Sequence, residues 1–288
     1  MARILVTGAT GRIGAALLPL LRDRGHAVRA VTRRPDAGAA IAEAGAEAVV
    51  ADIRSPDSLR EAFAEADAVF LLTADAPDQD DVERGLIESA AAAGRPHIVK
   101  LSAQSAGLAP PRSFGIFHRR AERALAESGL PHTILRPVFF QQSLLLFAGD
   151  IAAKGKFAAP AGTGRIAMVD TGDIAACAAI VLADPAHHGQ TYTLTGPAAH
   201  SLPEVAGLLG EKLGRRIGFA SPPAFVARLV LPFVTGMPRW QSNLAVDLFA
   251  AIREGAQEAV SPDVERLTGR PATGLDAFLA AHIDAFRG

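Results

Sequence analysis

The sequence predicts an α/β protein in which a doubly wound parallel sheet carries helices on both faces and a smaller, mostly helical lobe follows. Apolar runs rich in β-branched residues alternate with helical stretches through the first half of the chain. The runs are apolar throughout, as expected for strands buried on both faces. The alternation stops after Pro137, and residues 201–288 have a helical pattern interrupted by prolines. We therefore expect a cofactor domain over 1–155 and a substrate lobe over 156–288, with 165–195 packing partly on the first domain.

Each expected element follows from a local pattern. The run Ala-Val-Arg-Ala-Val-Thr at 27–32 is typical of a strand, and Ser55 before Pro56 is a helix-start signal. Strands are expected at 4–6, 27–32, 46–51, 68–73, 97–102 and 133–135. Helices are expected at 12–24, 36–44, 56–66, 79–93 and 113–128. Later in the chain we expect short strands at 165–169 and 190–195 and a helix at 171–183.

A glycine turn joins the first strand to the first helix. Gly8, Gly11 and Gly14 are spaced three residues apart between a short apolar run and a helical stretch. In such a turn the first glycine provides unusual backbone angles, the second lets the backbone approach a pyrophosphate, and the third lets the helix pack closely on its strand. Strand, turn and helix in this order predict a Rossmann-type dinucleotide site rather than a purely structural turn. The other candidate contacts in this turn are Thr10, Arg12 and Ile13.

The residues after the second, third and fourth strands predict the cofactor. Arg33 and Arg34 stand where an NAD-specific domain usually has an acid, and two guanidiniums suit a 2′-phosphate. We therefore expect NADP(H), with Arg33 the main contact; solvated loop charges are the alternative. Asp52 is expected at the adenine, or else in a turn or helix cap. Ile53 accompanies it at the adenine, and the candidates beside the ribose are Leu72 and Thr73.

Composition narrows the classes of function. Apolar residues make up 49% of the 288 residues, and 29 basic against 30 acidic side chains leave a net charge of −1. This balance disfavours nucleic-acid and anionic-membrane partners. No apolar run approaches the roughly 18 residues that cross a bilayer. The single Cys177 permits no internal disulfide, so we expect a cytoplasmic protein. No metal-ligand spacing occurs, and a homodimer is compatible with the sequence.

Several motifs together resemble the NmrA-like branch of the atypical short-chain dehydrogenases/reductases. They are residues 7–14, Arg33, Asp52, the triplet 135–137 and the segment 166–196. The resemblance covers nearly the whole chain. It implies the Rossmann-type fold, NADP(H) binding and a cofactor contact at Pro137. It also implies a choice of activities, because the branch includes reductases of quinones, triphenylmethane dyes and iminium ions as well as regulators that bind dinucleotide without catalysis.

The catalytic pattern departs from that of ordinary short-chain dehydrogenases, which use Tyr-x-x-x-Lys on a helix. The only tyrosine, Tyr192, lies elsewhere, whereas His118 and Glu122 have the i, i+4 spacing on the expected helix. We expect them to form a proton relay with Ser102, in which the carboxylate raises the imidazole pKa; a purely structural pair is the alternative. Lys100 is expected at the surface or the ribose, and Arg136 against a carboxylate.

The lack of a tyrosine acid favours acceptors that are already electron-poor. Phe114, Phe139 and Phe140 are expected to line a pocket for a small aromatic substrate. The preferred interpretation is an NADPH-dependent reductase of a hydrophobic aromatic electrophile such as a quinone. The alternatives are a non-catalytic NADP(H) redox sensor and a secondary-metabolism reductase of imines or enones.

Overall fold

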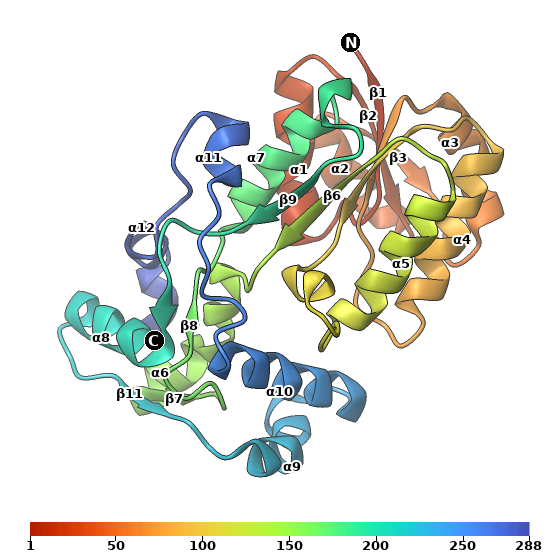
Figure 1. Cartoon of the computed structure of the whole chain (residues 1–288). Helices are drawn as coiled ribbons and strands as arrows, with labels where there is room; N and C mark the ends of the chain where they lie inside the picture. The colour runs from red at the N-terminus through yellow and green to blue at the C-terminus, as the bar shows by residue number, and fades with distance from the viewer. Residues whose placement is uncertain (288) are drawn as a thin grey trace.

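A parallel sheet forms the frame of the molecule, for which a computed structural model describes residues 1–287. Within this range the sheet has seven strands in the order β3-β2-β1-β4-β5-β6-β9, and every pair is parallel (Figure 1). The strands are β1 (Arg3–Val6), β2 (Ala27–Thr32), β3 (Glu47–Val50), β4 (Ala68–Leu71), β5 (His97–Leu101), β6 (His132–Pro137) and β9 (Thr191–Leu194). The predicted α/β fold class is confirmed.

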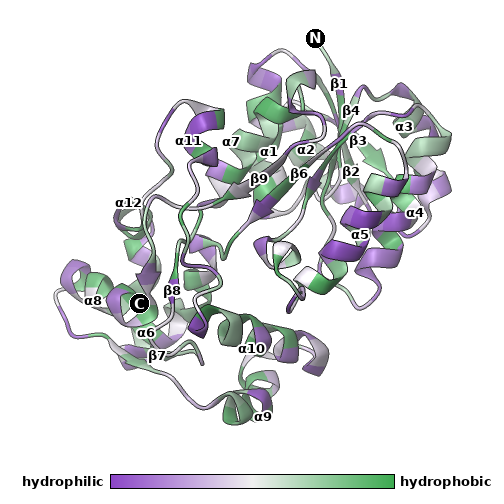
Figure 2. Cartoon of the chain, viewed as in Figure 1, coloured by the Kyte–Doolittle hydropathy of each residue, from purple (hydrophilic) through white to green (hydrophobic). Residues whose placement is uncertain are grey.

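Helices cover both faces of the sheet. One face carries α1 (Arg12–Asp23), α2 (Gly38–Glu43) and α7 (Thr171–Val181), and the other α3 (Arg60–Glu65), α4 (Gln79–Ala92) and α5 (Gly115–Glu127) (Figure 1). Alternate residues of β1 enter different cores. Ile4 and Val6 pack with α1 and α7, whereas Leu5 packs with α3 and α4. The sheet and the inner helix faces are accordingly hydrophobic (Figure 2).

The second half of the chain returns to the sheet. Helix α7 packs on α1, and β9 extends the sheet beyond β6. The Asp170 side chain accepts a hydrogen bond of 2.6 Å from the Gly172 N–H and so caps α7. The short helix α11 (Asp263–Thr268) lies against α7 and β9. These elements correspond to the expected helix at 171–183 and strand at 190–195.

Two local expectations differ from the structure. The expected helix at 56–66 is a 3₁₀ turn (Pro56–Leu59) followed by α3, and the Ser55 side chain makes no capping hydrogen bond. The expected strand at 165–169 is only β8 (Arg165–Ile166), which pairs antiparallel with β10 (His200–Ser201) outside the main sheet. A two-residue strand has too little pattern for its bounds to be predicted from a sequence.

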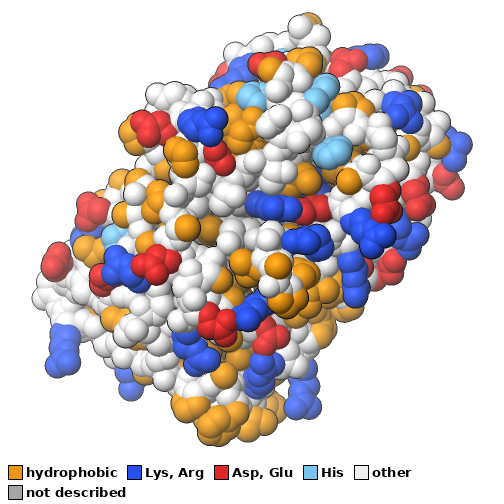
Figure 3. Space-filling view, in the orientation of Figure 1, with side chains coloured by type: hydrophobic (Ala, Val, Ile, Leu, Met, Phe, Trp, Pro, Cys, Tyr) orange, Lys and Arg blue, Asp and Glu red, His pale blue; other side chains and the backbone are white. Residues whose placement is uncertain are grey.

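The remaining elements form a lobe around a core of its own. They are α6 (Ala148–Lys154), β7 (Lys156–Ala158), α8 (Leu202–Leu213), β11 (Gly218–Ala220), α9 (Ala224–Thr235), α10 (Arg239–Arg253) and α12 (Leu275–Ala281). Their core begins in sequence at Leu144 and ends at Phe286. Helix α9 leaves apolar side chains exposed at the lower end of the molecule (Figure 3), among them Phe225, Leu229 and Phe233. None of the helices formed by residues 1–287 is long and apolar enough to cross a membrane.

Candidate active site

The glycine turn is built as a dinucleotide site requires. Gly8 has φ +64°, which disfavours a side chain, and a Cβ on Gly14 would lie 2.3 Å from the Gly8 carbonyl oxygen. Gly11 begins α1 without any capping side chain. The N–H groups of the first helical turn, at Arg12 and Ile13, are therefore available to an anion. This donor set fits a pyrophosphate.

A cavity of about 490 Å³ opens beside this turn, at the carboxyl ends of β1, β2 and β4. Such crevices are where open α/β sheets bind ligands. Of the residues predicted to bind cofactor, the cavity is lined by Gly8, Thr10, Gly11, Arg33, Arg34, Ile53, Leu72 and Thr73. Asp52 is not part of the lining, because its carboxylate accepts a 3.0 Å hydrogen bond from the Arg54 N–H and shapes a turn. Pro137 is buried at the end of β6, next to Leu194 of β9.

Three arginines lie at this cavity, and two of them are neutralised. Both nitrogens of the Arg34 fork bind Asp36, at 2.6 and 3.2 Å, and Arg54 is paired with Asp78. Arg33 is exposed and forms no ion pair or hydrogen bond within residues 1–287. The structure therefore leaves Arg33 as the guanidinium that is available to an anionic group of a ligand.

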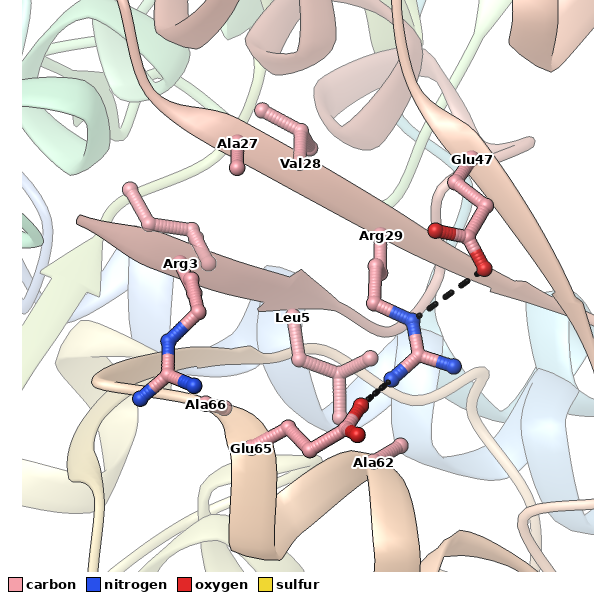
Figure 4. Close-up of a pocket in the computed structure, with 10 residues that line it drawn as sticks. Arg3, Leu5, Ala27, Val28, Arg29, Glu47, Ala62, Glu65 and Ala66 are labelled. Atoms are coloured by element: carbon pink, nitrogen blue, oxygen red, sulfur yellow. Dashed lines mark hydrogen bonds and ion pairs between the residues drawn. The ribbon is translucent and has the colours of Figure 1, made fainter. Parts of the chain in front are cut away.

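A second cavity, of about 310 Å³, lies at the opposite edge of the sheet (Figure 4). Arg29 crosses it and contacts Glu65 at 2.5 Å and Glu47 at 3.5 Å. It borders the amino ends of β1, β2 and β3, away from the glycine turn. Because its central cation is already paired at the amino edge, we do not assign the cofactor to it.

A buried ion pair lies beneath the carboxyl ends of β4 and β5. The Lys100 Nζ donates to Glu83 Oε2 of α4 at 2.6 Å, and both side chains are almost inaccessible to solvent. Thr73, which lines the cofactor cavity, donates to the other Glu83 oxygen at 2.7 Å. Lys100 does not lie at the surface, contrary to that part of the expectation. A lysine in a strand buried on both faces needs a partner within the fold, and α4 supplies one.

Glu122 belongs to a different polar cluster. It accepts hydrogen bonds from Ser102 Oγ at 2.5 Å and from the Arg136 guanidinium at 2.6 and 2.9 Å. The expected contact of Arg136 with a carboxylate is confirmed. Ser102 and Glu122 are brought together as predicted, but both are buried and their polar atoms are already engaged.

His118 does not pair with Glu122, contrary to the predicted relay. The Nδ1 atom of His118 lies 3.4 Å from Lys100 Nζ. Burial, together with the Lys100 charge, lowers the pKa of His118 well below its ordinary value, whereas the relay required it to rise. The i, i+4 spacing gave both residues the same helix face, but β5 and β6 offered each a different partner.

The predicted aromatic residues are placed separately. Phe139 packs toward the lobe, with its ring centroid 6.0 Å from that of Phe249 in α10. Phe140 packs instead against the sheet core, and Phe114 is partly buried at the start of α5. Tyr192 lies in β9, where its hydroxyl is 2.7 Å from the His187 Nδ1 that precedes the strand.

Sequence reasoning missed part of the cavity wall. The residues after β4 and along α4 complete the lining, namely Ala74, Asp75, Ala76, Gln79 and Val82. Because these residues come directly after β4, which borders the cavity, their position could have predicted that they line it. Glu83 was missed as well. The presence of Lys100 inside an otherwise apolar strand indicated that a buried acidic partner was needed.

Comparisons with known proteins agree with this geometry. A profile of the NAD(P)H-binding family matches residues 8–185. An NAD(P)H azoreductase from Xenophilus azovorans is 33% identical over 283 residues, covering 98% of this chain and 99% of that protein. A (4-alkanoyl-5-oxo-2,5-dihydrofuran-3-yl)methyl phosphate reductase from Streptomyces griseus subsp. griseus is 35% identical over 287 residues, covering 98% and 99%.

A solved structure is also similar over nearly the whole chain. The NADPH complex of an NADPH-dependent quinone oxidoreductase from Escherichia coli superposes with a TM-score of 0.90 at 27% identity, covering 96% of this chain and 99% of that one. The fold and the site thus define an NAD(P)H-dependent oxidoreductase. The chain belongs to the NAD(P)H-binding family, in the NmrA-like group of atypical short-chain dehydrogenases/reductases.

Proposed function

We propose that this protein is an NADPH-dependent reductase that passes hydride to a small, flat, electron-poor acceptor, most simply a quinone. One observation carries the proposal: the buried acids and the ammonium beneath the carboxyl edge, together with the tyrosine hydroxyl, are already engaged. Glu83 binds Lys100 and Glu122 binds Arg136, while Tyr192 is directed to His187. With Glu83, Glu122 and Tyr192 engaged in this way, the site favours acceptors that take hydride directly.

The glycine turn and the residues that line the cavity would hold NADPH, which would supply the hydride, and water would supply the proton that the reduced acceptor takes up. The residues of this chain hold the reactants and provide hydrogen bonds. His118 is the candidate donor to the acceptor, with Ser102 and Glu122 fixing the end of β5. The protein is proposed to act in the cytoplasm.

We propose that Arg33 selects NADPH by binding its 2′-phosphate, since it is the unpaired guanidinium of the cavity within residues 1–287. Residues 1–155 with 165–195 would hold the cofactor, and the rest of 156–288 the acceptor. Phe139 is proposed as the substrate contact, because its ring packs with the lobe and follows β6 at the carboxyl edge. The azoreductase and quinone oxidoreductase among the relatives support a conjugated acceptor.

The test is NADPH oxidation with quinones, azo dyes, cationic dyes and enones. We expect saturable turnover with at least one quinone. Phe139→Ala should raise KM for that acceptor more than it weakens NADPH binding, because its contact area serves the acceptor. Phe225→Ala, which removes a ring exposed on α9, is the matched control and should leave KM unchanged.

Two results would contradict the proposal. Tight NADPH binding without turnover of any acceptor would indicate a redox sensor. Turnover confined to enones would indicate the other alternative, which is supported by the oxo-dihydrofuran named as the substrate of the Streptomyces relative.

A further inference from the structure

The buried ammonium of Lys100 has three hydrogen-bond acceptors around it. These are Glu83 Oε2 at 2.6 Å, the Leu101 carbonyl oxygen at 3.2 Å and His118 Nδ1 at 3.4 Å. The side chain is 0% exposed, so water cannot replace a missing partner. A lysine ammonium has three N–H groups and no acceptor. Three donors and three acceptors match one to one.

The surroundings of Glu83 favour the ionised form of this pair. Thr73 Oγ1 donates to Glu83 Oε1 at 2.7 Å, and Gln79 Nε2 lies 3.4 Å from the same oxygen. Both Glu83 oxygens therefore accept hydrogen bonds, which stabilises a carboxylate over a carboxylic acid. An ionised Glu83 in turn keeps the proton on Lys100, because each buried charge needs the other.

We infer that Lys100 is a positioning residue that fixes the tautomer of His118. A protonated Lys100 donates to Nδ1, so Nδ1 must be an acceptor and the neutral ring carries its proton on Nε2. His118 then meets the acceptor molecule as a neutral N–H donor, not as an imidazolium that releases a proton. This use of His118 rests on the proposed reductase function, whereas the tautomer itself does not.

The other charged groups around His118 do not counteract this arrangement. On its own helix, Arg119 donates to the Ala106 and Leu108 carbonyl oxygens, and Glu122 is neutralised by Arg136. From β5 and α4 the facing charges are Lys100, which opposes a positive charge on the His118 ring, and Glu83, which is bound to Lys100. Within residues 1–287 the Nε2 atom of His118 forms no hydrogen bond with the protein, and the residue is only half-buried.

The tautomer can be measured without turnover. In protein labelled with ¹⁵N-histidine, His118 should show a pyridine-type Nδ1 and a pyrrole-type Nε2 whose shifts stay constant between about pH 5 and pH 8, the range in which an ordinary histidine titrates. A pyrrole-type Nδ1, or titration of His118 in that range, would overturn the inference. An enzyme without any acceptor would refute the proposed function but leave this measurement valid.

The variants separate positioning from stability. Lys100→Met alone would leave the Glu83 charge buried without a partner and would destabilise the fold. The double variant Lys100→Met/Glu83→Gln removes both charges and is therefore used. Burial is the main cause of the lowered His118 pKa and the Lys100 charge the second, so removing that charge should raise the pKa toward its ordinary value of about 6.5 and make the titration visible at the acidic end of this range. The pH profile of kcat/KM should acquire the same transition. Lys154→Met, which removes an exposed ammonium paired with Asp150, is the matched control and should leave both flat.

A second pair of variants tests the donor role. His118→Gln keeps an N–H near the position of Nε2, whereas His118→Ala removes it. We expect His118→Ala to lower kcat by about 10²-fold, as loss of one donor to a developing oxyanion does, and His118→Gln to recover most of this. Equal losses in the two variants, or no transition in the double variant, would refute the assignment.

Discussion

The same glycine-to-alanine change should have different consequences at two positions of the glycine turn. A Cβ on Gly14 would lie 2.3 Å from the Gly8 carbonyl oxygen and 2.7 Å from the Ala9 Cα, both of them backbone atoms. A Cβ on Gly11 would meet only the Gly8 carbonyl oxygen, at 3.2 Å, and otherwise faces the space assigned to the pyrophosphate. Gly11 has φ −82° and ψ 169°, which alanine adopts without strain.

The magnitudes follow from these contacts. Gly14→Ala forces α1 away from β1, and overpacking of this kind costs about 1–3 kcal/mol or somewhat more. That corresponds to a fall in Tm on the order of 5 °C for a chain of this size. Gly11→Ala should leave stability nearly unchanged but weaken NADPH at least tenfold, which is about 1.4 kcal/mol. The methyl group occupies the path by which the phosphates reach the N–H groups of α1.

The assay combines urea unfolding of the cofactor-free protein with NADPH titration by fluorescence. Gly149→Ala is the matched control, since its Cβ would meet no atom within 4 Å, and it should bind NADPH normally. A Gly11→Ala protein with wild-type NADPH affinity would refute the placement of the pyrophosphate. A Gly14→Ala protein as stable as the wild type would refute the packing argument.

Two further outcomes are expected. The wild type should prefer NADPH over NADH at least tenfold, and Arg33→Ala should remove most of this preference. Arg34→Ala should remove little of it, because Arg34 is bound to Asp36. Titration with both cofactors measures the preference, and equal effects of the two variants would contradict the prediction. Burial and the neighbouring histidines lower the pKa of His97 to about 4, so the unfolded state binds more protons below its ordinary pKa of about 6.5. The His97 contribution to the free energy of unfolding should therefore be complete above about pH 6.5 and fall by on the order of 3 kcal/mol by pH 4. Denaturant unfolding at both pH values should show this loss in the wild type but not in His97→Phe. An equal loss in the variant would refute the assignment to His97.

The sequence predicted those parts of the fold that local patterns encode. The strands of the main sheet and the glycine turn are determined by residues that are adjacent in the sequence, as where an apolar run directly precedes Gly8. Most of the cavity lining followed because each cofactor residue comes directly after a strand, and parallel strands end at one edge. β8 was expected with too great a length and β10 was missed, because two-residue strands depend on partners far along the chain.

The side-chain pairings could not be predicted in the same way. His118 and Glu122 share a helix face, so their spacing made a pair plausible. The competing partners lie on other elements: Lys100 on β5 for His118, and Ser102 and Arg136 for Glu122. Which pair forms depends on the distance between helix and sheet, and that distance is set by packing. Of these features, only the burial of Lys100 could have been predicted from the sequence, since apolar residues stand on both sides of it in the strand.

The way in which the lobe is attached to the sheet bears on the proposed acceptor specificity. Ser113 Oγ donates to the Leu244 carbonyl oxygen at 2.6 Å, and Gln104 Nε2 donates to the Ala256 carbonyl oxygen at 2.9 Å. Both anchors on the lobe are backbone oxygens, in α10 and just after it, so they persist whatever side chains α10 carries. The cofactor side, in contrast, depends on individual side chains such as Arg33. In the proposed reductase, substitutions on α10 would therefore alter the surface offered to the acceptor without removing these two hydrogen bonds, whereas substitutions around the glycine turn would affect cofactor binding for every acceptor.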